Sequence, residues 1–439
     1  MGIRKLINGI LQLGAESTAT TQATAVIQSM SGSLALVPSG SGAITAAIPD
    51  GTATGGNARG IYAVDLQIVR DSNVKVAGSI YSVIAGGYWN GIDVNSGYSV
   101  ITGGAANRIA NGGYAFIGSG NSNFINGGFG FNHVIVGGTS NTVSGGNGNT
   151  FIGGGSTNTV SGGYGVITGG LNNTVSSNYS TVSGGQSNAA STNTHATVVG
   201  GQSNTASGQY SVAGGLSNTA SGGRSFAFGN NNTASGLNGI ALGDTNTASG
   251  QAAIAFNGRT QATSGYSATF GYFSRSYLPG QQVFNSGFFT AAGDNQQSLL
   301  TPYKQDTLTT GATSSLSLDG TGTTNLIIPN GNNRAWNVTI DTIAVVTAIT
   351  GTATGVTVGD CYRETKQLLF KRIGGTSSIV GTVDTSAIKS DSGMSTAALT
   401  VTAGASQEMA LTFTAPTFTG GGSVTCRVVS KVMLVEVAY

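Results

Sequence analysis

The stretch Ser211-Val-Ala-Gly-Gly-Leu-Ser-Asn-Thr-Ala-Ser-Gly222 decides the fold of this chain, because close copies of it follow one another along the sequence. Its second half, Asn-Thr-Ala-Ser-Gly, recurs every 14 residues, beginning at Asn204, Asn218, Asn232 and Asn246. Looser copies, at spacings of up to 18 residues, continue upstream to Tyr81. A short repeated period of this kind is typical of proteins in which each copy is one structural unit.

Each copy has the composition of two short strands joined by two tight turns. A run such as Tyr98-Ser-Val-Ile-Thr alternates apolar and small residues, which is the period of a β-strand. The Gly-Gly that follows supplies positive φ at a corner, Asn-Thr-Ala-Ser makes a second strand, and Ser-Gly turns the chain again. Copies this short leave no room for a crossover helix between parallel strands. We therefore expect a parallel β-solenoid, or β-roll, with one coil per copy and strands about 4.8 Å apart.

The repeat also predicts how coils hold together. One coil contributes only a few apolar side chains, so stacking is expected to leave an apolar face along the column. Three columns around a common axis would cover that face, which predicts a homotrimer, with a thin single solenoid as the alternative. The Asn at one register is expected to form an amide ladder. Only 8% of the residues are charged, which fits a stack in which like charges would repel.

The copies that end at Gly222, Gly236 and Gly250 resemble the head repeats of trimeric autotransporter adhesins. That resemblance implies left-handed parallel β-rolls assembled as trimers. An autotransporter would also need a signal peptide and a coiled-coil stalk, and the sequence indicates neither.

The flanks resemble bacteriophage tail fibre proteins instead. Pro49-Asp-Gly-Thr-Ala-Thr-Gly-Gly-Asn-Ala-Arg-Gly-Ile-Tyr-Ala-Val-Asp-Leu-Gln67 is similar to a segment that precedes such repeats in those proteins. Four later stretches, in the right order, resemble the C-terminal domain of phage fibres: Ala291–Ser298, Leu316–Gly322, Leu326–Ile340 and Val424–Val437.

Charge divides the chain into three predicted domains. Residues 79–280 contain six charged side chains and form the predicted β-roll shaft, whereas 1–78 are expected to attach to the virion and 281–439 to form a tip domain. Alternating stretches separated by turn signals predict a jelly-roll-like β-sandwich in the tip. The predicted strands are 315–318, 325–328, 335–346, 364–372, 379–383, 398–401, 409–413 and 424–436.

Composition excludes several classes of protein. The 72 glycines do not recur every third residue, so the chain is not collagen-like, and its net charge of +2 without a basic cluster argues against a nucleic-acid partner. No run of 18 apolar residues occurs, so no membrane insertion is expected. Cys361 and Cys426 are expected to be free or buried thiols. No cofactor or metal is expected. His133 and His195 are assigned to coil edges, with a metal held by three copies on a trimer axis as the alternative.

An enzymatic role is not expected from the sequence. Glycosidases need two carboxylates a few ångströms apart, and Asp93 and Asp244 of the repeats lie many coils from each other. No pair is evident among the acidic residues of the tip, which are Asp341, Asp360, Glu364, Asp384, Asp391, Glu408 and Glu436. Aromatic residues that would stack on sugars are Trp89, Trp336, Tyr62, Tyr362 and Tyr439, although Trp336 is better explained as core.

Together these features predict a trimeric phage tail fibre or related virion fibre, synthesised in the host cytoplasm. Residues 1–78 would bind other tail, baseplate or portal-proximal proteins, and the tip would bind a host surface glycan or outer-membrane protein. Weak candidates for receptor contact are Tyr362, Arg363, Lys366, Lys371 and Arg372, because basic side chains would meet acidic glycans; an ordinary exposed strand face is the alternative. The alternative functions are a secreted trimeric bacterial adhesin, a polysaccharide-depolymerising tailspike and, least consistent with Asn-Thr-Ala-Ser, an ice-binding solenoid.

Overall fold

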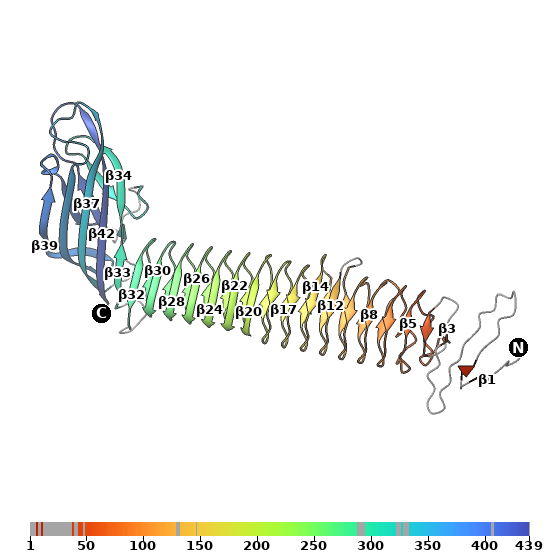
Figure 1. Cartoon of the computed structure of the whole chain (residues 1–439). Helices are drawn as coiled ribbons and strands as arrows, with labels where there is room; N and C mark the ends of the chain where they lie inside the picture. The colour runs from red at the N-terminus through yellow and green to blue at the C-terminus, as the bar shows by residue number, and fades with distance from the viewer. Residues whose placement is uncertain are drawn as a thin grey trace. The chain divides into compact units, whose positions relative to one another are not determined.

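The computed structural model describes residues 43–46, 49–128, 132–145, 147–287, 295–321, 333–404 and 408–438, together with the backbone of strands 6–7, 10–11, 37–38 and 326–327. These residues are all-β except for one 3-10 turn, Ser392–Met394. They form two compact units, Met1–Asn149 and Thr150–Tyr439, each built on a parallel β-solenoid (Figure 1). The expected fold class is confirmed. Within the described part, no helix is long and apolar enough to span a bilayer.

The first unit contains coils made of two parallel strand columns. One column consists of β4 (Ile44–Thr45), β5 (Val64–Asp65), β6 (Val83–Ile84), β8 (Val100–Ile101), β10 (Phe116–Ile117) and β12 (His133–Ile135). The other consists of β7 (Gly91–Ile92), β9 (Arg108–Ile109), β11 (Phe124–Asn126) and β13 (Thr142–Ser144). Antiparallel pairs join β1 (Leu6–Ile7) to β2 (Ile10–Leu11) and β3 (Val37–Pro38) to β4. Parallel pairing therefore begins upstream of residue 79, where the shaft was predicted to start.

The second unit continues the same design and adds a sandwich. Its first column consists of β14 (Thr150–Ile152), β16 (Val166–Ile167), β18 (Thr181–Val182), β20 (Thr197–Gln202), β22 (Val212–Leu216), β24 (Phe226–Asn230), β26 (Ile240–Asp244), β28 (Ile254–Gly258), β30 (Ala268–Tyr272) and β32 (Gln282–Asn285). Its second column consists of β15 (Thr159–Val160), β17 (Thr174–Val175), β19 (Ala189–Ala190), β21 (Thr205–Ala206), β23 (Thr219–Ala220), β25 (Thr233–Ala234), β27 (Thr247–Ala248), β29 (Gln261–Ala262) and β31 (Arg275–Ser276).

The interior of each coil is closed within a single chain. The two columns turn one side chain each inward, and these are fully buried, as for Ile167 with Val175 and for Ala241 with Ala248. The 14-residue coils use Ala where the longer coils use Ile or Val, so the size of the buried side chain follows the length of the coil. The sequence argument that a single column leaves its apolar side open therefore does not apply to these inward residues.

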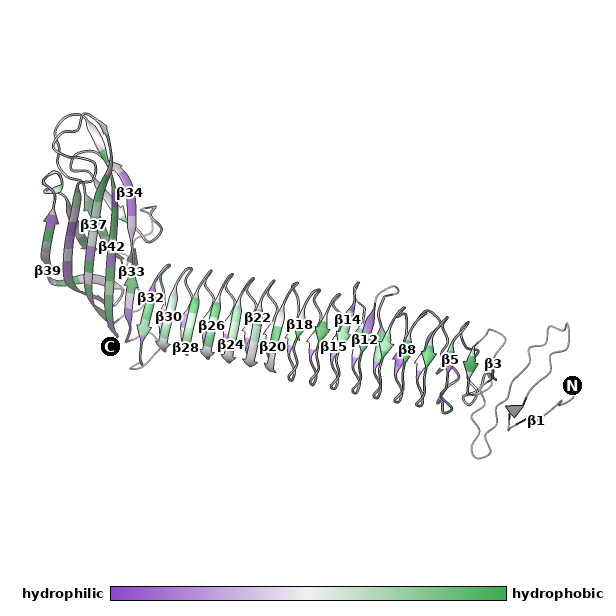
Figure 2. Cartoon of the chain, in the orientation of Figure 1, coloured by the Kyte–Doolittle hydropathy of each residue, from purple (hydrophilic) through white to green (hydrophobic). Residues whose placement is uncertain are grey.

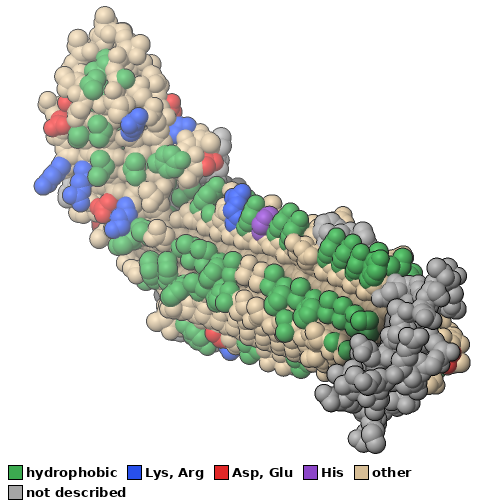
Figure 3. Space-filling model, turned by 45° about the vertical axis from the view of Figure 1, so that its right-hand side comes forward, with side chains coloured by type: hydrophobic (Ala, Val, Ile, Leu, Met, Phe, Trp, Pro, Cys, Tyr) green, Lys and Arg blue, Asp and Glu red, His purple; other side chains and the backbone are tan. Residues whose placement is uncertain are grey.

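A separate set of apolar side chains points outward. In the second unit the exposed members include Val199, Leu216, Phe226, Phe256 and Phe284. Figure 3 shows hydrophobic side chains gathered in rows along the solenoid surface. These outward rows are the face that the predicted trimer would cover. The trimer and the left-handed coil stay predictions.

The amide ladder is confirmed. Asn218 is buried, and its Oδ1 accepts the backbone N–H of Asn232 at 3.0 Å and its side-chain N–H at 2.9 Å. Its Nδ2 donates to the carbonyls of Gly214 and Gly229, both at 2.7 Å. The same pattern repeats from coil to coil until Thr260, whose hydroxyl and N–H both donate to Asn246.

The corners of the coils use left-handed backbone more widely than expected. The second glycine of the pair that follows the first strand has positive φ, as predicted, for example Gly201 at 98° and Gly215 at 104°. Non-glycine residues such as Tyr210, at 56°, and Ser217, at 56°, also adopt it. Each donates its backbone N–H to the preceding coil, Tyr210 to Thr194 and Ser217 to Gln202. These bonds offset the roughly 1–2 kcal/mol that the conformation costs.

The tip is a two-layer antiparallel sandwich. One layer contains β34 (Tyr303–Leu308), β42 (Gly422–Ala438), β37 (Arg334–Gly351), β38 (Cys361–Ile373) and β39 (Thr376–Ser390), and β33 (Gln297–Leu300) also pairs with β42. The other contains β35 (Thr313–Leu316), β41 (Glu408–Thr414), β36 (Leu326–Ile327) and β40 (Ala398–Ala403). Strands occur in all eight predicted stretches, whereas β33 and β34 were not predicted. Hydrophobic and polar residues alternate along the long strands (Figure 2), and the inward ones form the core between the layers.

The sandwich is joined directly to the last coil. Strand β32 pairs in parallel with β30 on one side and antiparallel with β33 on the other. Gln296 accepts the N–H of Arg275 through its Oε1 at 3.1 Å, and its backbone carbonyl accepts the N–H of Glu436 at 2.9 Å. Leu278 of the last coil belongs to the sandwich core.

Candidate functional site

The five weak receptor candidates lie on β38 but not on one surface. Even-numbered residues of this strand face the interior and odd-numbered ones face outward. Tyr362 and Arg372 are consequently buried, at 1% and 4% exposure, and Lys366 is half-buried against the interior. Arg363 is exposed on the outer side, and Lys371 is half-buried there. The structure therefore divides the basic stretch between two environments.

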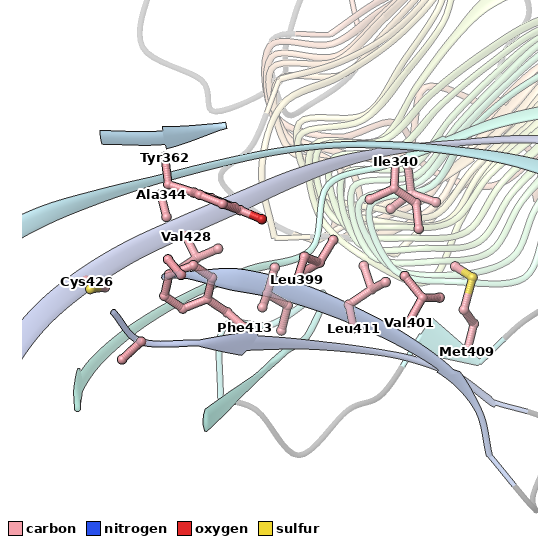
Figure 4. Packing of buried hydrophobic residues seen from close by; sticks show 14 of the residues in the cluster. Ile340, Ala344, Tyr362, Leu399, Val401, Met409, Leu411, Phe413, Cys426 and Val428 are labelled. Carbon is pink, nitrogen blue, oxygen red and sulfur yellow. The ribbon is translucent and has the colours of Figure 1, made fainter. Parts of the chain in front are cut away.

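Tyr362 and Lys366 belong to an internal network centred on Glu364. The Tyr362 hydroxyl donates to Glu364, and the N–H of Leu399 donates to the same carboxylate oxygen at 3.1 Å. Lys366 Nζ lies 2.7 Å from the other oxygen and donates to Thr385 Oγ1 at 3.1 Å. Burial, and next the hydrogen bond and charge of Glu364, raise the pKa of Tyr362 well above its usual range. The Tyr362 ring packs among core side chains (Figure 4) and presents no face to a sugar.

A cavity of about 660 Å³ lies where the last coils meet the sandwich. Its apolar wall consists of Phe270 and Phe284, whose rings stack 5.3 Å apart at 13°, together with Val435. The polar lining is supplied by amides and one hydroxyl, from Asn285, Ser286, Asn295, Gln296 and Gln297. Asn285 Nδ2 is buried and has no hydrogen-bond partner within the described residues. The cavity thus combines stacked aromatic rings with several amide donors and acceptors.

This cavity was not predicted from the sequence, although the sequence holds two signals for it. First, Phe270 and Phe284 occupy a strand position that is Gly214 in an earlier coil. Second, Asn285 occupies the corner position that is Gly271 in the preceding coil. The neighbouring Val435 comes from the far end of the chain, and only the folded topology brings it here.

The remaining aromatic candidates are distributed over the molecule. Trp89 is 40% exposed and packs edge-on against Tyr88, and Tyr62 is 57% exposed and stacks on Tyr81. Trp336 is fully buried, as the core interpretation predicted. Tyr439 lies outside the described residues.

The two histidines differ. His195 is exposed at a coil corner and stacks between Tyr179 and Tyr210. His133 begins β12 but is buried rather than at an edge, and this burial lowers its pKa. Among the described residues, no group of three potential metal ligands occurs.

Two acidic residues that the sequence separates come together around Cys361. The N–H of Cys361 donates to Asp391 Oδ2 at 2.8 Å, and Asp360 directly precedes it. Asp360 accepts the N–H and hydroxyl of Thr357, both at 2.8 Å, and lies against Gly393 just after Asp391. Two acidic residues that are distant in the sequence are therefore neighbours in the fold. Both cysteines are free, as expected: Cys361 is exposed, and burial raises the pKa of the Cys426 thiol to about 11.

No family model and no curated protein matches the chain. Three solved structures that resemble it are tailspike proteins of Acinetobacter phages. That of A. baumannii phage AM24 has 10% identity and a TM-score of 0.25, and the match covers 81% of this chain and 66% of that one. That of phage vB_ApiP_P1 has 10% identity and a TM-score of 0.24 over 91% and 76% of the two chains. Gp49 of A. baumannii phage Fri1 has 7% identity and a TM-score of 0.21 over 90% and 80%.

At such identities and TM-scores, none of the three assigns an activity, substrate or assembly to this chain. One expectation is nevertheless corrected. The Fri1 protein is described as a capsular polysaccharide depolymerase, so the expectation that the present chain is not an enzyme is not retained. That expectation judged carboxylates by their separation in the sequence, whereas the pairing of β38 with β39 places Asp360 and Asp391 at one end of the same strand pair.

Proposed function

We propose that the chain is a phage tail receptor-binding protein that engages a polysaccharide of the host surface. The support comes from the phage-fibre-like sequence of its flanks and from the solenoid that ends in a sandwich. Residues preceding the coils would attach it to the virion, and the C-terminal sandwich would face the host.

The cavity lined by Phe270 and Phe284 carries this proposal. Sugar rings present apolar C–H faces, which stack on aromatic rings, and hydroxyls at their edges, which pair with amides. A mostly apolar pocket with a few convergent polar groups is the usual form of a small-ligand site. Asn285 supplies one such group, because its buried amide N–H has no partner in the described part of the chain.

The outward apolar rows support a trimer, in which three sandwiches would act together. Linked sites raise avidity by a factor of about 10²–10⁴ without a new contact. A modest single site would then be sufficient for attachment to a repetitive polysaccharide.

Binding of fluorescently labelled host capsule by the full chain tests the proposal. Phe284→Ala should weaken binding about tenfold, which corresponds to about 1.4 kcal/mol. Phe256→Ala is the matched control, because Phe256 is similarly exposed on the same strand column but does not line the cavity. Equal loss in both variants, or none in either, would refute the cavity as the site. Detection of the chain in purified virions separates a phage protein from a bacterial adhesin.

A second candidate function is depolymerisation of that polysaccharide, which the pairing of Asp360 with Asp391 favours. Two carboxyl groups near each other suit acid–base cleavage of a glycosidic bond. Incubation with capsule should release reducing ends, and Asp391→Asn should abolish the release while leaving capsule binding intact. Capsule that binds but stays intact with the wild-type chain would remove this candidate.

A further inference from the structure

We infer that the inner face of the sandwich, at the end that holds Arg372, is a binding site for a carboxylate group. Arg372 is 4% exposed, and its Nε and Nη1 are buried without a hydrogen-bond partner among the described residues. These two N–H groups lie on different edges of the guanidinium, so each needs an acceptor of its own, and the charge of the group has no counter-ion among the described residues. An uncompensated buried guanidinium is strongly unfavourable, so an anion is the partner that this position requires.

The neighbours of Arg372 add further unsatisfied donors. Arg372 is the direct cross-strand partner of Arg334 on one side and of Ser377 on the other, so the three side chains share the inner face. Trp336, two residues along from Arg334, is on the same face. The indole N–H of Trp336 and the hydroxyl of Ser377 are both buried without a partner. Donors from three adjacent strands thus gather beside Arg372.

Among the described residues at this end of the sandwich, the positive charge of Arg372 is not balanced by a carboxylate. Glu436, on the neighbouring strand, forms an ion pair with Arg334 and accepts from Gln296 Nε2 at 3.4 Å. Arg334 also lies over the ring of Tyr277, 5.7 Å from its centroid. Glu436 is therefore already used by Arg334, and the described residues supply no ion pair for Arg372. The site needs one further carboxylate.

Position in the fold places the site at one end of its layer. Arg372 lies one residue before the end of β38, next to the hairpin turn of Gly374 and Gly375, both with positive φ. It is thus near the edge of the sandwich rather than at its centre. Given the polysaccharide function proposed above, on which this step rests, the carboxylate would belong to an acidic sugar such as a uronic acid.

Thermal unfolding of the full chain tests the inference. At pH 7 and constant ionic strength, sodium glucuronate should raise the Tm saturably by about 2–4 °C, and glucose should not. Sodium acetate distinguishes the sources: an equal rise with acetate supports a carboxylate site but removes the sugar as its specific ligand. No saturable rise with either carboxylate would overturn the inference.

Substitutions locate the effect. Arg372→Met should abolish the rise while leaving the Tm without ligand unchanged or higher, because it removes an unpaired buried charge. Arg372→Lys, which keeps the charge but not the planar guanidinium with its several N–H donors, should weaken the response about tenfold in concentration. Arg363→Gln, on the outer side of the same strand, is the matched control and should respond like wild type. A full response in Arg372→Met would refute the site.

The proposed polysaccharide function is tested by a separate experiment, so that it and the carboxylate site can fail independently. Capsule binding is measured with Phe284→Ala, which lies outside the Arg372 cluster and should leave the glucuronate response unchanged. A glucuronate response without capsule binding would keep the carboxylate site and remove the function. Capsule binding without a glucuronate response would do the reverse.

Discussion

The solenoid and the sandwich of the second unit treat buried polar groups in opposite ways. In the solenoid, each buried Asn satisfies its own coil and the next one, whereas the buried hydroxyls of Ser211 and Ser225 have no partner among the described residues. In the sandwich, Trp336, Arg372 and Ser377 retain buried donors that find no acceptor in the described part of the chain. Repetition thus solves the hydrogen-bonding problem of the buried Asn once and copies the solution, whereas the guanidinium and indole donors without a partner lie where the second unit stops repeating. That difference directs the search for function to the sandwich and to Asn285 of the coil that adjoins it.

The largest expected loss of stability comes from a substitution in the amide ladder of the solenoid. Asn218→Leu removes the acceptor of the Asn232 N–H and leaves the carbonyls of Gly214 and Gly229 without a donor. At about 1–3 kcal/mol for each buried unsatisfied group, the loss is about 5 kcal/mol. Calorimetric unfolding should show it, and Asn230→Ala, which changes an exposed Asn of the next coil, should cost less than about 0.5 kcal/mol. Similar small losses in both variants would contradict a supporting role of the ladder.

A loss of about 3–4 kcal/mol is expected for Glu364→Ala in the sandwich. It leaves Lys366 without its carboxylate and Tyr362 and Leu399 without their acceptor. Hydrogen exchange should report faster opening of β38 and β40, with the coils unaffected. Arg372→Met provides the contrast, since it removes a charge that has no internal partner and should not destabilise.

A third prediction concerns how tightly the interior of the 14-residue coils is packed. Ala241→Ile places a larger side chain in a 14-residue coil whose interior is filled by Ala, at an expected cost of about 1–3 kcal/mol. The same change at exposed Ala85, whose backbone is not left-handed, should be nearly neutral in chemical denaturation. Retention of full stability by Ala241→Ile would show that the short coils have spare interior volume.

The smallest effect concerns alkaline pH. The folded pKa values of Tyr362 and Cys426 are raised by burial, so the unfolded chain releases their protons first. Stability of the sandwich should therefore be intact below about pH 9 and should fall as pH rises from 9 towards 11, by about 1–2 kcal/mol. Cys426→Val should reduce this slope in pH-dependent unfolding. A slope equal to that of wild type would exclude a contribution from Cys426.

The sequence is most informative where it repeats. The spacing of Asn204, Asn218, Asn232 and Asn246 predicts both the coil and the amide ladder, because one residue at one register must meet its own copy. Corners at Tyr210 and Ser217 could not be predicted, since left-handed backbone is unfavourable for such residues until a neighbouring coil supplies the hydrogen bond.

In the sandwich, pattern predicted strands but not sites. Alternation along β38 separates Tyr362 and Arg372 from Arg363, yet charges occur on both sides and obscure the pattern in the sequence. Phe284 and Val435 meet only through the pairing of β32, β33 and β42. Asp360 and Asp391 likewise become neighbours through strand pairing, which sequence distance does not reveal.

The uniform hydrogen bonding of the amide ladder has a consequence for how the number of coils can change in evolution. The ladder Asn of each 14-residue copy donates its backbone N–H to the coil behind it and accepts through its Oδ1 from the coil ahead, and Thr260 closes the series with a hydroxyl. Duplication or deletion of one whole copy between Asn204 and Gly250 would consequently leave both ends unaltered while changing the reach of the protein by about 4.8 Å. The length of the solenoid can then change in evolution by whole coils, independently of what the sandwich binds.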